Sequence, residues 1–239
     1  MNQIFSNKLL LFFIIIFLSI IIVFFVCKFN KINFKTNLKS QQEFIEDIPP
    51  TEDLMREHGI LNRVLLSYEE IVKRLDNNKN FKIDNLKQGA LIIRNFIEDY
   101  HEKLEEQYIF SRFQKAGKLV DLVNSLLDQH KAGRILTDQI IDLANEDKVS
   151  DSNNKQKLIQ AIKSFIIMYR VHEYREDTEL FPAFRSLITQ KEFEELADLF
   201  EDTEHELFGK EGFQGILKQV EIIEKDLDIY DINKFTTNS

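Results

Sequence analysis

The chain contains 239 residues, enough for one ordinary domain or two small ones. It has only 7 Gly and 3 Pro, and this shortage of turn-forming residues disfavours a β-sandwich or β-barrel and favours long helices. The 44% of apolar residues excludes a disordered chain, and the formal net charge of −9 excludes a protein that neutralises nucleic-acid phosphates. The single Cys excludes a disulfide framework and a cysteine-based zinc site.

Residues 9–27 are apolar apart from Ser19, and this run predicts a single transmembrane helix. As a helix it would be about 28 Å long, close to the roughly 30 Å thickness of a hydrocarbon core. A cleaved signal peptide is the alternative, but its apolar region would be about 7–15 residues long and small residues would follow it. A lipoprotein signal would use Cys27, and the bulky Phe25 and Val26 before it disfavour that interpretation.

Lysines are more numerous after this run than before it, and the positive-inside rule therefore predicts a cytoplasmic C-terminal domain. Residues 1–8 form the flank before the span. Residues 28–50 are rich in Lys, Asn and Gln and predict a short tether that ends at two prolines. We expect residues 51–235 to form one domain with its own core.

Apolar residues recur at helical steps of three and four in four long segments of residues 51–235. Polar loops at 76–82 and 146–157 and the break at Gly117 separate these segments. The pattern predicts an all-α fold, an antiparallel four-helix bundle followed by additional C-terminal helices at about 189–207 and 216–227. Thr51 and Asp84 are the N-caps that we expect for the first two helices.

The apolar residues of each segment form a stripe along one helix face, which we expect to point into the bundle. Histidines occupy positions in these inward stripes where Leu or Ile would normally stand; they are His58, His101, His130 and His172. Glu105 and Glu176 follow two of them by four residues, so each carboxylate shares a helix face with an imidazole. Burying two unpaired carboxylates would cost several kcal/mol each, and a bound cation would remove that cost. Imidazole with carboxylate suits iron, manganese or zinc, so the sequence predicts a metal site.

The chain repeats this arrangement. His58 precedes His101 by 43 residues, and His130 precedes His172 by 42. The segment 101–110 also aligns with 172–181, since each begins His-Glu and ends in Phe. We therefore expect two helical hairpins related by a pseudo-twofold axis, each of which contributes half of one site.

These motifs resemble the hemerythrin-like (HHE cation-binding) family over roughly residues 50–235. The resemblance implies a cofactor of two non-haem iron ions inside the bundle, although other divalent metals are compatible with the same ligands. It also implies that the histidines are terminal ligands and that Glu105 and Glu176 bridge the two ions.

The sequence departs from the oxygen-carrying hemerythrins of marine worms, because Arg134 stands where those proteins carry a second His on the third helix. One iron would then lack a nitrogen ligand, and His205 from the additional helix is the candidate to replace it. We expect Arg134 to pair with Glu105 or Glu176. Three further glutamates are expected on solvated helix faces, whereas Glu179 is an outer candidate for the site; the three are Glu102, Glu106 and Glu173.

The expected function is that of a membrane-anchored di-iron protein that binds or senses O2 or a related small oxidant. The alternatives are a di-iron oxidoreductase that consumes peroxide or NO, and an interaction bundle whose metal site is merely stabilising. The sequence indicates no catalytic residue, since Tyr108 and Tyr169 near the stripes are equally compatible with the core. Beyond the small-molecule ligand and the membrane, which residues 9–27 would contact, the sequence names no partner.

Overall fold

The computed structural model describes residues 48–236, and in this part of the chain every regular element is a helix. The predicted membrane span, residues 9–27, lies outside the described residues, as do the flank before it and nearly all of the tether. None of the helices within residues 48–236 combines the length and the apolar character needed to cross a bilayer.

The elements follow one another with short connections. In chain order they are α2 (Pro50–Asp76), α3 (Ile83–Ile92), η1 (Ile93–His101), α4 (Glu102–Leu104), η2 (Glu105–Phe110), α5 (Ser111–Ala116), α6 (Val120–Leu143), α7 (Glu146–Ser150), α8 (Ser152–Arg175), η3 (Glu176–Leu180), α9 (Phe181–Phe184), η4 (Arg185–Leu187), α10 (Gln190–Phe208), α11 (Gly212–Asp226) and η5 (Ile232–Phe235). The segments η1, η2 and η3 are π-helical, whereas η4 and η5 are 3₁₀ turns.

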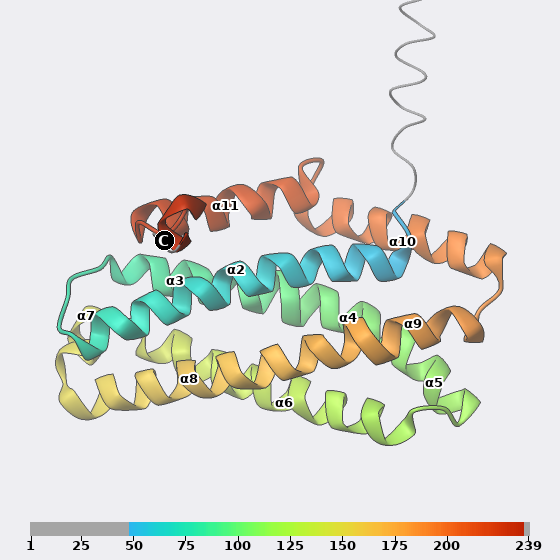
Figure 1. Cartoon of the computed structure of the whole chain (residues 1–239), viewed down its shortest axis with the longest axis horizontal. Helices are drawn as coiled ribbons and strands as arrows, with labels where there is room; N and C mark the ends of the chain where they lie inside the picture. Colours follow the sequence, from blue (N-terminus) through green and yellow to red (C-terminus); the bar gives the residue numbers. More distant parts are fainter. Residues whose placement is uncertain (1–47, 237–239) are drawn as a thin grey trace, which may run out of the picture. The chain divides into compact units, whose positions relative to one another are not determined.

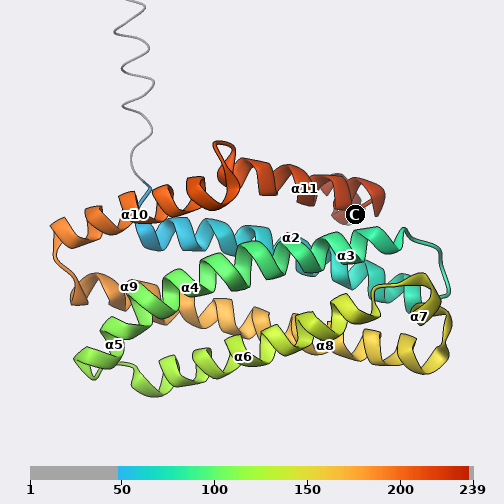
Figure 2. The same cartoon turned by 180° about the vertical axis from the view of Figure 1, so that it is seen from behind.

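Four antiparallel rods form the bundle (Figure 1). The first is α2, the second runs without a break from α3 to α5, the third is α6, and the fourth runs from α8 to α9. Figures 1 and 2 show that each rod reverses the direction of the one before it, and that α10 and α11 lie along α2 and α3. The predicted all-α fold with additional C-terminal helices is thus confirmed.

The N-cap residues of the first two helices differ from the predicted ones. Helix α2 begins one residue early, with Pro50 at its first position, because a proline lacks the N–H that the first turn leaves unbonded. Thr51 is therefore not the N-cap. Asp84 lies in the first turn of α3, whose N-cap residue is Lys82 without a side-chain hydrogen bond. Both predictions of capping residues were wrong, although the positions of the helices were right.

The predicted loop at 146–157 is largely helical. Two polar residues cap the helices: Asn145, directly before the segment, accepts a hydrogen bond from the backbone N–H of Asp147 at 2.9 Å, and Asp151 accepts one from the backbone N–H of Asn154 at 2.9 Å. These caps begin α7 and α8 inside the segment. The break at Gly117 is confirmed, because this residue ends α5 with a φ of 65°, a left-handed conformation that glycine adopts without strain.

The π-helical segments coincide with the candidate ligands. His101 ends η1, Glu105 begins η2, and Glu176 begins η3. In an α-helix with 3.6 residues per turn, the two successive steps of four from Ile97 to His101 to Glu105 would drift around the axis. The wider π turns keep these side chains on the inner face, and such turns frequently mark functional sites.

Candidate metal centre

Six predicted ligands converge in the interior from all four rods. Each is at most 3% exposed; they are His58 on α2, His101 and Glu105 on the second rod, His130 on α6, and His172 and Glu176 on the fourth rod. Their ligand atoms form two groups that share Glu105, and within each group all atoms lie within 4.8 Å of one another. The structure therefore brings together six of the seven predicted ligands.

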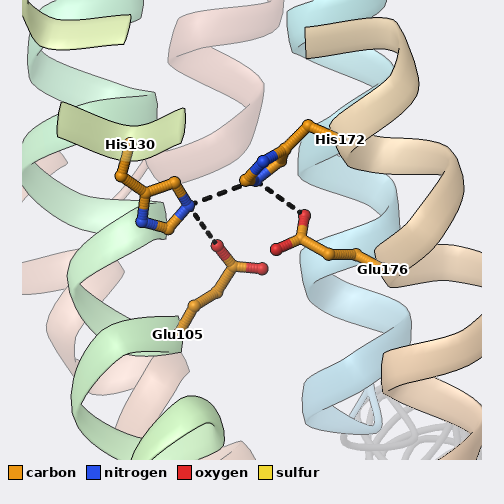
Figure 3. A group of neighbouring side chains, drawn as sticks. All are labelled: Glu105, His130, His172 and Glu176. Atoms are coloured by element: carbon orange, nitrogen blue, oxygen red, sulfur yellow. Dashed lines mark hydrogen bonds and ion pairs between the residues drawn. The ribbon is translucent and has the colours of Figure 1, made fainter. Parts of the chain in front are cut away.

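One half of the centre combines His130, His172 and Glu176 of the second hairpin with Glu105 of the first (Figure 3). The Nε2 atoms of His130 and His172 lie 3.1 Å apart. His130 Nε2 is 3.5 Å from Glu105 Oε2, and His172 Nε2 is 3.2 Å from Glu176 Oε2. Two imidazoles and two carboxylates thus face one point.

The other half combines His58, His101 and Glu105 of the first hairpin with Glu176 of the second. The rings of His58 and His101 have centroids 4.8 Å apart. His101 Nε2 is 3.6 Å from Glu105 Oε1, and His58 Nε2 is 3.4 Å from Glu176 Oε2. Each glutamate therefore approaches one imidazole of each hairpin, which is the position of a bridge between two ions.

The donor set fits a pair of cations. All four side-chain oxygens of Glu105 and Glu176 are buried, and none has a hydrogen-bond partner within residues 48–236. A buried carboxylate without a partner costs several kcal/mol. Divalent ions bound between the imidazoles and these oxygens would remove that cost.

The Nδ1 atom of each of the four histidines in the centre forms a hydrogen bond with another polar side chain. His101 Nδ1 donates to Glu57 at 2.6 Å, and His58 Nδ1 donates to Asp177 at 2.8 Å. In the second hairpin, Nδ1 of His130 donates to Glu106 at 3.1 Å and Nδ1 of His172 donates to Gln129 at 3.0 Å. These bonds direct each Nε2 at the centre, the arrangement typical of metal-bound histidine.

The pseudo-twofold relation extends to the surroundings of the ligands. His58 corresponds to His130, and their Nδ1 partners, Asp177 and Glu106, come directly after Glu176 and Glu105. Five residues beyond each of these two glutamates, Phe181 stacks on His58 and Phe110 stacks on His130, with centroid distances of 5.7 and 5.4 Å. The predicted repeat is therefore present in side-chain contacts as well as in spacing.

A known protein family and several known sequences match this chain. The family model described as Hemerythrin HHE cation binding domain matches residues 50–184. The chain belongs to this family. Uncharacterized proteins of Mycobacterium bovis and of two strains of Mycobacterium tuberculosis are each 45% identical over 193 residues, which is 80% of this chain and 76% of the relative. No solved structure was found to match the chain.

Arg134 of this hemerythrin HHE domain has different partners from those expected. Its Nη2 atom is 2.6 Å from Glu102 Oε2 and 2.8 Å from Glu106 Oε1, so the predicted pairing with Glu105 or Glu176 is wrong. Glu102 is 1% exposed and also accepts a hydrogen bond from the Tyr169 hydroxyl at 2.7 Å. Arg134 therefore compensates buried charge beside the ligands.

Two of the three glutamates expected on solvated faces are buried. Glu102 is one, and Glu173 is the other, at 1% exposure with a hydrogen bond from Asn62. The third, Glu106, is half-buried between Arg134 and His130. Each binds a partner on a different rod, and such contacts cannot be seen in the spacing along one helix.

The C-terminal candidates lie outside the hemerythrin HHE centre. His205 is exposed on α10 and belongs to neither ligand group. The buried side chains of α10 are Leu196, Ala197, Phe200 and Glu204, and the next residue after Glu204 points about 100° away around the helix. Glu179 is also exposed and pairs with Arg175, so the structure does not support it as an outer ligand.

Buried charges set the proton affinities of the metal-free centre. Burial and the charge of Glu176 raise the pKa of Glu105 well above its usual value. Burial opposes ionisation of Glu176 as well, but the neighbouring His172 and His58 outweigh it and hold the pKa of Glu176 well below its usual value. Burial opposes protonation of His58, yet the hydrogen bond to Asp177 and the negative charge of Glu176 raise its pKa to about 10. Metal binding must therefore displace protons.

Sequence reasoning missed the side chains that orient the imidazoles. Glu57 is fully buried and Asp177 is half-buried, and neither was identified. A signal was present, because each stands directly beside a predicted ligand, His58 or Glu176. A metal-bound imidazole requires an acceptor at Nδ1, so acidic neighbours of predicted ligands are the residues to test for that role.

Proposed function

We propose that this hemerythrin HHE domain holds two non-haem iron ions and binds or senses O2 or a related small oxidant. The observation that carries the proposal is the position of Glu105 and Glu176 between the imidazoles of the two hairpins, with their four oxygens unpaired among the described residues. Imidazole and carboxylate donors together suit iron. Four protein donors around each ion would leave coordination positions open for a small ligand.

The side chains of the centre would have separate tasks. The imidazoles would hold the ions through Nε2, and their Nδ1 hydrogen bonds fix the ring orientations. Phe110 and Phe181 stack on two of the imidazoles and are themselves buried, so they would keep water from the centre. The iron pair, when bound, supplies the reversible binding of a small oxidant. A dry, apolar surrounding then limits side reactions of that ligand.

We further propose that residues 9–27 anchor the domain in a membrane, with the domain on the cytoplasmic side. The apolar run and the lysines after it support this orientation. An anchored protein does not diffuse as a carrier, so local binding or sensing suits it better than transport. A reporter fused after Ser239 and assayed for accessibility tests the orientation, and an externally accessible reporter would overturn it.

Metal analysis tests the identity and number of the ions. We expect the full chain, purified from iron-replete cells, to contain two irons and to show the near-ultraviolet absorption of a carboxylate-bridged ferric pair. His130→Ala should lose that absorption, whereas His205→Ala, an exposed control, should retain both iron and spectrum. One zinc ion per chain, or an equal loss in both variants, would contradict the proposal.

Steady-state turnover separates binding from catalysis. If the protein binds or senses, hydrogen peroxide and NO should be consumed no faster by the iron-loaded wild type than by His172→Ala. Rapid turnover by the wild type that disappears in His172→Ala would replace the binding function with that of a di-iron oxidoreductase. The measurement needs the same iron-loaded preparation, so iron content is determined on each sample.

A further inference from the structure

A second cluster of buried acidic side chains lies outside the paired centre. Asp53 and Glu57 stand one turn apart on α2, and Glu204 approaches them from α10. The three are 7%, 0% and 7% exposed. One carboxylate oxygen from each lies within 4.8 Å of the other two, close enough for all three to contact one ion.

The cluster carries more negative charge than its neighbours cancel. Arg56 is the only Lys or Arg that forms an ion pair with it within residues 48–236. Its Nη2 atom is 2.6 Å from Asp53 Oδ1 but 3.7 Å from Glu204 Oε2, which is too long for a hydrogen bond. The guanidinium group also lies 4.2 Å over the ring of Phe213. Three carboxylates and one guanidinium leave a formal charge of about −2 in a buried site.

Unpartnered polar atoms face this charge. Glu57 Oε1, Glu204 Oε2 and the hydroxyl oxygen of Tyr100 are buried, and in the described part of the chain none makes a hydrogen bond of good geometry. Tyr100 is 1% exposed and comes from the second rod, independently of the acidic residues. Burial and the charges of Glu57, Asp53 and Glu204 beside its hydroxyl raise the pKa of Tyr100.

The turn between α10 and α11 is built around one of the carboxylates. The backbone N–H of Phe213 donates to Glu204 Oε1 at 3.0 Å, which leaves Oε2 for the cluster. Gly212 has a φ of 42°, and a Cβ at this position would overlap the Glu204 carboxylate. The turn therefore requires glycine where the backbone passes over Glu204, and it fixes the direction of the side chain.

We propose that Asp53, Glu57 and Glu204 form a third cation site, which takes a hard divalent ion such as Mn²⁺ or Mg²⁺. The Tyr100 hydroxyl is its neutral protein ligand. An all-oxygen donor set is the one that these ions prefer, and a charge of +2 cancels the excess of the cluster. The ion connects α10 to α2. It also adjoins the paired centre, because Glu57 Oε2 accepts the Nδ1 hydrogen bond of His101.

Titration with Mn²⁺ tests the proposal on the full chain, purified in detergent and loaded with iron. Free Mn²⁺ is followed by electron paramagnetic resonance, and iron is counted in the same sample. We expect one Mn²⁺ per chain to bind without displacing iron. Glu204→Gln, which keeps the acceptor for Phe213, should weaken this binding at least tenfold. Glu206→Gln on the exposed face of the same helix is the matched control and should leave it unchanged.

Asp53→Asn is the second variant, because it leaves the turn at Gly212 intact, and it should also weaken Mn²⁺ binding at least tenfold. Absence of a bound Mn²⁺, or equal affinity in wild type and Glu204→Gln, would show that protons balance the cluster and would overturn the proposal. The iron count reports on the paired centre separately. If the iron count is lower than two, the comparison of Mn²⁺ binding by Glu204→Gln and Glu206→Gln still tests the third site. The proposal of a third site and the proposal of an iron pair can therefore be refuted separately.

Discussion

Glu105→Gln should change the stability of the domain in opposite directions with and without metal. In the metal-free protein, Glu105 is fully buried and both of its oxygens lack partners within residues 48–236. Because its pKa is raised, the Glu105 carboxyl destabilises the folded state at any pH above the usual value of 4.5. Over that range the folded state must bind a proton that the unfolded state releases. At 1.36 kcal/mol per pH unit, the cost at pH 7 is at most about 3.4 kcal/mol.

Glutamine has the same shape, carries no charge and can donate a hydrogen bond to Glu176, whose oxygens are also unpaired among the described residues. We therefore expect chelated Glu105→Gln to be about 2 kcal/mol more stable than chelated wild type, which is about 4–8 °C for a domain of this size. With iron present the order should reverse. The wild type gains about 2.7 kcal/mol when the free ion exceeds its Kd a hundredfold, and the variant loses a bridging ligand.

Thermal melting by far-ultraviolet circular dichroism, with chelator and with iron, measures both effects. Glu179→Gln is the control, because Glu179 is exposed and pairs with Arg175, and it should change stability by less than about 0.5 kcal/mol in either condition. The gain in the chelated variant should also shrink as the pH falls toward 4.5. A chelated Glu105→Gln that melts at or below the chelated wild type would refute the argument that these carboxylates require cations.

Three further outcomes follow from other contacts. Gly133→Ala should destabilise the domain by about 1–3 kcal/mol in chemical denaturation, because its Cβ would lie 2.8 Å from Cζ of Tyr169, whereas Gly59→Ala, with no atom within 4 Å, should stabilise it slightly. Iron uptake should release about one proton or more, because His58 has a pKa of about 10 without metal and must lose a proton to bind. Calorimetry in buffers of different ionisation enthalpy measures this release, and equal heats of binding in all buffers would contradict it. Asp177→Asn should lower metal affinity about 10–100-fold in a chelator competition, and an unchanged affinity would show that the Asp177 hydrogen bond does not support the imidazole.

The sequence predicted which candidate ligands are buried, because their burial follows from local helical spacing. His58, His101, His130 and His172 lie on stripes of apolar residues, so the rods that bury Leu and Ile also bury them. The spacing of four residues likewise placed Glu176 beside an imidazole. The same regularity predicted the number of rods and their order.

The spacing of residues along one helix could not predict the contacts between different rods. Glu102 is buried because Arg134 and Tyr169 reach it from the third and fourth rods, and Glu173 is buried beside Asn62 of the first. Arg134 and Asn62 each stand four residues after a ligand histidine, so they are symmetry-related, although one is charged and the other is not. The position of His205 depended in the same way on how α10 rotates against α2.

The Nδ1 partners of the imidazoles differ in charge between the two hairpins, so two bound ions would be electronically unequal. On the first hairpin both imidazoles donate to carboxylates, Glu57 and Asp177, and so become electron-rich donors. On the second hairpin Gln129 replaces one carboxylate by a neutral amide. An ion held by the first hairpin would lose an electron more readily than its neighbour, so one-electron oxidation would leave a localised mixed-valence pair in an otherwise near-symmetric frame.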